Sequence, residues 1–153
     1  MGQEQVEILL VEDNPADLEL ALHALRREGL ANHVEVARDG EEALDFLFCR
    51  RQYAHRSSRH PPRLVLLDLK LPKVDGLQVL EQLKGNAATK AIPVAIVTAS
   101  REEQDLVKSY RLGVNSYIQK PVDFEQFRAT VKQASLYWLV VNQPPPPAAF
   151  GEK

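Results

Sequence analysis

Residues 64–76 read Leu-Val-Leu-Leu-Asp-Leu-Lys-Leu-Pro-Lys-Val-Asp-Gly, and this stretch decides the fold class of the chain. Its first four residues form an apolar run that is typical of a strand buried on both faces, and the run ends at Asp68. Glu12 and Asp13 follow a similar run, and Lys120 follows a shorter one. We therefore expect three carboxylates and one ammonium group to meet where neighbouring strands end.

Carboxylates that share one crevice repel each other unless a cation neutralises them. A divalent metal ion together with the Lys120 ammonium group would supply that charge. Such an arrangement is suited to phosphoryl chemistry on an aspartate, because phosphoryl transfer depends mainly on positioning and charge neutralisation.

The bulk properties indicate one globular domain. The chain has 153 residues, of which 44% are hydrophobic and 26% charged, with a formal net charge of −2. This balance gives no indication of nucleic acid or of an anionic membrane as a partner. The single cysteine, Cys49, excludes an internal disulfide and favours a reducing compartment. We find no signal peptide and no apolar stretch of membrane-spanning length, so we predict a cytoplasmic protein.

Apolar runs alternate with helical patterns along the chain. The predicted strands are Ile8–Val11, Val34–Ala37, Leu64–Leu67, Pro93–Thr98 and Ser116–Gln119. The predicted helices begin at Asn14-Pro15, Gly40, Asp75, Ser100 and Asp123. This alternation predicts a doubly wound α/β fold, with a parallel sheet covered by helices on both faces.

Ligands of such sheets bind beyond the carboxyl ends of the strands. Glu12, Asp13, Asp68 and Thr98 all lie at predicted strand ends, and Lys120 lies just past the fifth strand. Taken singly, each residue has an ordinary structural explanation, such as a helix cap or a solvated lysine. Their shared placement is what indicates a site.

The sequence resembles the response-regulator receiver domain of two-component signalling over about residues 7–140. The resemblance rests on Glu12-Asp13, on residues 64–76 around Asp68, on "VTAS" with Thr98, and on "YIQKP" with Tyr117, Lys120 and Pro121. More narrowly, "LVEDNPAD", "GVNSYIQKP" and a helix ending in "YWL" resemble the single-domain regulators that partner phytochrome-type histidine kinases.

The resemblance implies a flavodoxin-like sheet of strand order 2-1-3-4-5 with five helices, and a phosphoacceptor role for Asp68. It implies that Mg²⁺ or Mn²⁺ is held by Glu12, Asp13, Asp68 and the backbone carbonyl of Lys70, and that Thr98 and Lys120 contact the phosphoryl group. The chain would then be no enzyme in the usual sense. It would catalyse its own phosphorylation and slow dephosphorylation, with a sensor histidine kinase as phosphoryl donor.

Three further expectations follow from the family. Thr98 would move toward the phosphoryl group, and Tyr117 would rotate inward behind it. The Lys120-Pro121 peptide bond would be cis. A homodimer would form through the fourth helix, the fifth strand and the fifth helix, extended by Tyr137, Val140 and Val141.

We divide the chain into an N-terminal tail (1–6), the receiver domain (7–141) and a proline-rich flexible tail (142–153). The basic segment 50–63 is either a docking patch for an acidic partner or an ordinary polar loop. Both interpretations stay open at this point.

Two other functions compete with the receiver interpretation. Mg²⁺-dependent phosphatases of the haloacid dehalogenase type also use an aspartate nucleophile, but they resemble D-x-D-x-T, and Lys70 stands where the second Asp is needed. The other competitor is a receiver-like binding module that is never phosphorylated. The presence of all the key residue types argues against it.

Overall fold

The computed structural model describes residues 6–30, 33–121 and 123–150. Five parallel strands form one sheet in the order β2-β1-β3-β4-β5, so the predicted flavodoxin-like topology is confirmed. The strands are β1 (Ile8–Val11), β2 (Val34–Ala37), β3 (Leu64–Leu67), β4 (Val94–Thr98) and β5 (Ser116–Gln119).

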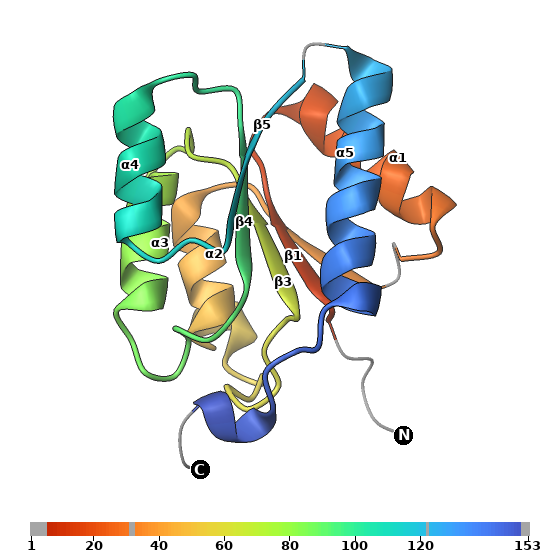
Figure 1. Cartoon of the computed structure of the whole chain (residues 1–153). Coiled ribbons are helices and arrows are strands. Elements are labelled where there is room, and N and C mark those ends of the chain that lie inside the picture. The colour runs from red at the N-terminus through yellow and green to blue at the C-terminus, as the bar shows by residue number, and fades with distance from the viewer. Residues whose placement is uncertain (1–5, 31–32, 122, 151–153) are drawn as a thin grey trace.

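Five helices cover the sheet, with α1 and α5 on one face and α2, α3 and α4 on the other (Figure 1). The helices are α1 (Pro15–Arg27), α2 (Gly40–Leu47), α3 (Gly76–Lys84), α4 (Glu103–Arg111) and α5 (Phe124–Leu136). Three short helical turns are also present: η2 (Arg51–Tyr53), η3 (Tyr137–Val141), which continues α5, and η4 (Pro147–Phe150).

Side chains of the central strands point alternately to the two faces of the sheet, and the core therefore has two parts. In β3, Val65 and Leu67 pack on the side of α2 and α3, whereas Leu64 and Leu66 pack on the side of α1 and α5. All four side chains are at most 2% exposed. Because successive side chains of a strand point to opposite faces, a strand between two helical layers must be apolar at every position.

The register of the sheet decides where the polar strand ends meet. Val11 of β1 pairs with Leu67 of β3, so the next residues, Glu12 and Asp68, also lie side by side. The backbone N–H of Asp68 donates to the carbonyl oxygen of Val11 at 3.1 Å. Hydrogen bonding along parallel strands thus carries the two carboxylates into one crevice.

The basic segment 50–63 is mostly occupied with contacts inside the chain. Arg50 and Arg51 form ion pairs with Asp45, and Arg63 pairs with Glu7. The Arg56 guanidinium lies 3.6 Å from the centre of the Phe46 ring and donates to the Phe46 carbonyl oxygen. These contacts support the interpretation of the segment as a structural loop rather than a free docking patch.

The C-terminal segment, predicted to be a flexible tail, contacts the core. Pro147–Phe150 forms η4, and Phe150 is buried against the core between the sheet and α2 and α3. Prolines restrict the unfolded chain, so ordering this segment costs little conformational entropy, while the aromatic ring gains burial. Phe150 therefore anchors this segment to the domain, and the flexibility of the tail stays a prediction. Residues 1–5 and 151–153 lie outside the described part of the chain.

Docking of the tail is expected to stabilise the domain measurably. Replacing Phe150 by Ala should lower the free energy of unfolding in urea by about 3 kcal/mol, since it leaves a ring-sized cavity in the core. Val141→Ala is the matched control, because Val141 is 70% exposed and its truncation leaves no cavity. Equal stability of the two variants would contradict the docking of the tail.

Candidate functional site

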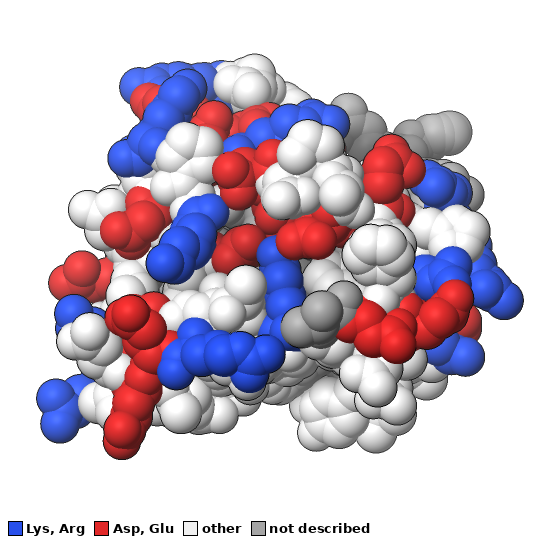
Figure 2. Space-filling model, turned by 90° about the horizontal axis from the view of Figure 1, so that it is seen from above, with Lys and Arg blue, Asp and Glu red and all other residues white. Residues whose placement is uncertain are grey.

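An acidic crevice lies at the carboxyl ends of β1 and β3. Glu12, Asp13 and Asp68 each place a carboxylate oxygen there, and these oxygens all lie within 4.8 Å of one another. Glu12 and Asp68 are buried, whereas Asp13 is exposed. Figure 2 shows acidic side chains gathered across the middle of this face of the molecule, with basic ones among and around them. The predicted grouping of the three residues is what the structure shows.

Lys120 neutralises part of this charge directly. Its Nζ donates to Asp17 Oδ2 at 2.7 Å, to Glu12 Oε1 at 2.8 Å and to Asp68 Oδ2 at 3.0 Å. The three N–H donors of one ammonium group thus match three carboxylates. The Lys120 backbone N–H donates to the carbonyl oxygen of Thr98 at 2.7 Å, which holds the residue beside β4.

Asp17 is the residue that the sequence analysis missed. It belongs to the first turn of α1, and an acidic residue so soon after the Asn14 cap, at the end where β1 reaches the crevice, is the signal that could have indicated it. An acidic residue in a first helical turn also interacts favourably with the helix dipole, which explains its sequence position equally well. Only the fold brings Lys120, 103 residues further on, to within 2.7 Å of it.

Burial and charge shift two pKa values in the crevice. Burial raises the pKa of Glu12 from 4.5 to about 7; the hydrogen bond from Lys120 opposes this shift and the nearby Asp68 carboxylate reinforces it. For Lys120, burial alone would lower the pKa, but the hydrogen bonds to Asp17 and Glu12 and the charge of Asp68 outweigh it and raise the pKa above its ordinary value. The ammonium group is therefore charged at neutral pH.

Asn14 organises the entry to α1 and the crevice together. Its backbone N–H donates to Glu12 Oε2 at 3.0 Å. Its side-chain oxygen accepts hydrogen bonds from the backbone N–H groups of Ala16 and Asp17, at 2.9 and 3.1 Å. Asn14 is thus a helix cap, as the sequence indicates, and it also orients one carboxylate of the site.

The loop after Asp68 is held close to the backbone of α3. A Cβ atom at Gly76 would lie 2.3 Å from the Asp68 carbonyl oxygen, so only glycine permits this approach. Within the loop, the Lys70 backbone N–H donates to Asp68 Oδ1 at 3.3 Å. This places the Lys70 backbone beside the crevice, and the role of its carbonyl oxygen as a metal ligand remains a prediction.

Thr98 and Tyr117 lie on the β4 and β5 side of the site. Thr98 is fully buried, and its hydroxyl oxygen accepts a hydrogen bond from the Ser100 N–H at 3.2 Å. The Tyr117 ring packs against the core, and burial raises the pKa of its hydroxyl, while the nearby Ser100 side chain partly opposes this shift. The movement of Thr98 toward a phosphoryl group and the inward rotation of Tyr117 remain predictions.

The expected cis peptide bond is wrong. The described residues contain no cis peptide bond, so Lys120 and Pro121 are joined in trans. The physical reason is that the trans chain already brings the Lys120 Nζ to three carboxylates while its backbone stays paired with Thr98.

The donor set suits a hard divalent cation. Carboxylate oxygens are the ligands that Mg²⁺ and Mn²⁺ prefer, and Mg²⁺ usually takes one or two carboxylates together with waters and phosphate oxygens. Asp13 is exposed and Glu12 and Asp68 are buried beside it, so the cluster can be reached from solvent. Glu12, Asp13 and Asp68 would hold such an ion.

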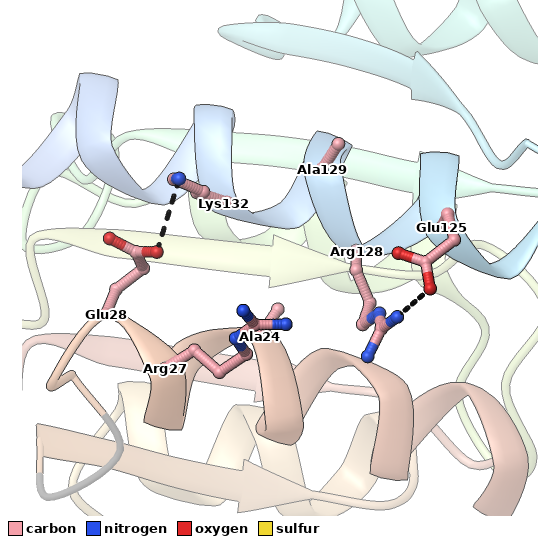
Figure 3. A pocket seen from close by; sticks show the side chains of 7 residues that line it. All are labelled: Ala24, Arg27, Glu28, Glu125, Arg128, Ala129 and Lys132. Atoms are coloured by element: carbon pink, nitrogen blue, oxygen red, sulfur yellow. Dashed lines mark hydrogen bonds and ion pairs between the residues drawn. The ribbon is translucent and has the colours of Figure 1, made fainter.

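A second hollow lies on the flank of the molecule, between α1 and α5 (Figure 3). Lys132 pairs there with Glu28 at 3.5 Å, and Arg128 pairs with Glu125. The first pair joins α5 to the C-cap of α1, and the second lies within α5. Because its acidic residues are already paired with cations of the chain, this hollow is a weaker candidate site than the acidic crevice.

Comparison with known proteins agrees with the fold. Residues 8–132 match the response regulator receiver domain, and the chain belongs to this family. The part of the chain that the structure describes contains no helix that is both long enough and apolar enough to cross a membrane.

Three solved relatives are similar over most of their length. The phosphorylated cyanobacterial phytochrome response regulator RcpA is 39% identical with a TM-score of 0.86, covering 93% of this chain and 99% of that one. The bacteriophytochrome response regulator AtBRR is 54% identical with a TM-score of 0.70, covering 92% and 100%.

The third relative is the response regulator Rcp1 of Synechocystis sp., which is 39% identical over 132 residues, or 86% of this chain and 88% of the relative. Its Mn²⁺-bound structure has a TM-score of 0.83 at 37% identity and covers 90% and 97%.

The raised pKa of Glu12 predicts an unusual pH dependence of stability. Between about pH 5 and pH 7 the folded chain retains a proton that the unfolded chain has lost, so stability falls as pH rises through this window. Measured by urea unfolding in the presence of a chelator, the loss should reach at most about 3 kcal/mol. Glu12→Gln cannot lose this proton and should show a smaller loss over the same window. If the free energy of unfolding depends on pH in the same way in both proteins, Glu12 is not the group that titrates in this window.

Proposed function

We propose that this chain is a stand-alone response regulator that accepts a phosphoryl group on Asp68 from a sensor histidine kinase. One observation carries the proposal. The Asp68 carboxylate lies 3.0 Å from the Lys120 ammonium group, in a crevice that also holds Glu12 and Asp13. An aspartate nucleophile, an adjacent cation and a carboxylate cluster for a divalent ion are what phosphoryl transfer to a protein side chain requires.

In the proposed step, an oxygen of Asp68 forms a bond to the phosphorus atom while the bond from phosphorus to the histidine nitrogen of the kinase breaks. Lys120 donates a hydrogen bond to a phosphoryl oxygen, and the Thr98 hydroxyl turns from Ser100 to donate a second. A bound Mg²⁺ or Mn²⁺ would neutralise negative charge on the phosphoryl oxygens. The same groups support slow hydrolysis of the aspartyl phosphate.

The neighbourhood of Thr98 supports a conformational response. The Tyr117 ring already packs against the core, and Ser100, whose backbone N–H donates to the Thr98 hydroxyl oxygen, has its side chain near the Tyr117 hydroxyl. A shift of Thr98 would therefore change the packing of β5 beside it. Such a local change can bias the surface formed by α4, β5 and α5.

That surface includes exposed apolar side chains. In α4, Leu106, Val107 and Tyr110 are 38%, 39% and 54% exposed. In η3, Tyr137, Val140 and Val141 are 48%, 69% and 70% exposed. Exposed apolar groups of this kind favour an interaction surface, and we propose a homodimer through α4, β5 and α5 that extends to η3.

The similarity to RcpA, Rcp1 and AtBRR supports a phytochrome-type kinase as the partner. The free thiol of Cys49 supports a cytoplasmic location. The phosphatase alternative is weakened further by the site, because Lys70, two residues past Asp68, contributes its backbone N–H there and cannot act as an acid that protonates a leaving group.

Incubation with Mg²⁺ and acetyl phosphate tests the phosphoacceptor role. Intact-mass measurement should show one added phosphoryl group in the wild-type chain and none in Asp68→Asn, since the amide lacks the nucleophilic oxygen. A chain that instead turns over phosphomonoesters is a phosphatase. A chain that is folded but gains no mass is a binding module only.

Sedimentation equilibrium tests the dimer. The wild-type chain should sediment at twice its 17.2 kDa mass, whereas Tyr110→Glu and Val140→Glu should shift the protein toward the monomer because each buries a charge in the interface. Ala129→Glu, on α5 beside the hollow of Figure 3, is the control and should stay dimeric. A monomeric wild type, with or without the phosphoryl group, would exclude the dimer.

A further inference from the structure

Asp17 differs from the other carboxylates around Lys120. Its contact with the Lys120 Nζ, at 2.7 Å, is the shortest of the three. Its side chain is 28% exposed, whereas those of Glu12 and Asp68 are 6% and 8% exposed. Asp17 also lies outside the group of carboxylates whose oxygens approach one another within 4.8 Å. It therefore binds the ammonium group from the rim of the crevice, on the side of α1.

This position gives Asp17 a role that Glu12 and Asp68 cannot share. Both of those residues belong to the donor set that would bind a divalent cation. Their hydrogen bonds with Lys120 would weaken when their oxygens coordinate such a cation. Asp17 is outside that set, and its contact with Lys120 persists. All three N–H donors of Lys120 are already used, so a phosphoryl oxygen can gain one only if a carboxylate gives it up.

Asp17 also changes the formal charge of the crevice. Four carboxylates, one ammonium group and one divalent cation sum to −1, whereas the count without Asp17 is zero. Phosphorylation of Asp68 adds about one further negative charge at neutral pH. An incoming phosphoryl group thus meets one more negative charge than the three-carboxylate site would present.

From these contacts we infer that Asp17 is a positioning residue that retains Lys120 on the α1 side of the crevice and slows transfer of a phosphoryl group to Asp68. The inference rests on the proposed phosphoacceptor function and assigns its regulation to a residue of α1. Asp17 touches Lys120 and none of the reacting atoms, so it acts through the lysine.

The test compares Asp17→Asn with a matched loss of charge on the same helix. Glu19→Gln is that control, because Glu19 is 74% exposed and pairs with Arg26 only at 3.9 Å among the described residues. Asp17→Glu keeps the charge and should behave nearly as the wild type. The first readout is the initial rate of phosphorylation by acetyl phosphate at saturating Mg²⁺, followed by intact mass. We expect Asp17→Asn to raise this rate about threefold, as removal of one unit charge at a solvated distance of about 6 Å implies.

The second readout is the affinity for Mn²⁺, measured by calorimetry without any phosphoryl donor. Asp17→Asn should weaken it by about tenfold, because the same unit charge at about 6 Å acts on a doubly charged ion and Lys120 is left to Glu12 and Asp68. Faster phosphorylation with weaker metal binding is a pair of changes that simple loss of structure does not produce. If Asp17→Asn matches Glu19→Gln in both readouts, or lowers both, the inference is overturned. If the wild type gains no phosphoryl group, the proposed function fails, and the Mn²⁺ measurement still tests the hold of Asp17 on Lys120.

Discussion

The ion-pair cluster around Lys120 is the interaction on which the site depends. Buried carboxylates of like charge oppose folding unless a cation is close, and here one ammonium group meets Glu12, Asp17 and Asp68 at 2.7–3.0 Å. Burial, reinforced by the Asp68 carboxylate, raises the pKa of Glu12 in spite of its hydrogen bond from Lys120. A divalent cation in the crevice would supply further positive charge and favour the ionised form of Glu12.

The parallel sheet creates this cluster from distant parts of the chain. Register between β1 and β3 places Glu12 beside Asp68, and pairing of β4 with β5 places Lys120 beside Thr98. Gly76 then allows α3 to pack directly on the Asp68 backbone. The apolar strands therefore do more than form the core, since their hydrogen bonds decide which side chains can act together.

Function follows from the fact that one lysine serves several acceptors. In the proposed mechanism, Lys120 exchanges a carboxylate for a phosphoryl oxygen, so any residue that competes for its donors regulates the reaction. In that mechanism Asp17 would compete from α1, and Thr98 and Tyr117 would connect the same site to β5. A small redistribution of hydrogen bonds can thereby reach a surface that carries exposed apolar side chains of α4 and η3.

The chain order of strands and helices, the placement of Glu12, Asp13, Asp68, Thr98 and Lys120 at strand ends, and the receiver family were all available from the sequence. Apolar runs and capping residues are local signals, and the edge at which parallel strands end is a property of the fold class. The contact of Asp17 with Lys120, the trans bond before Pro121 and the burial of Phe150 were decided by the tertiary structure. Each of these depends on the distance between segments far apart in the chain, and local periodicity carries no information about that distance.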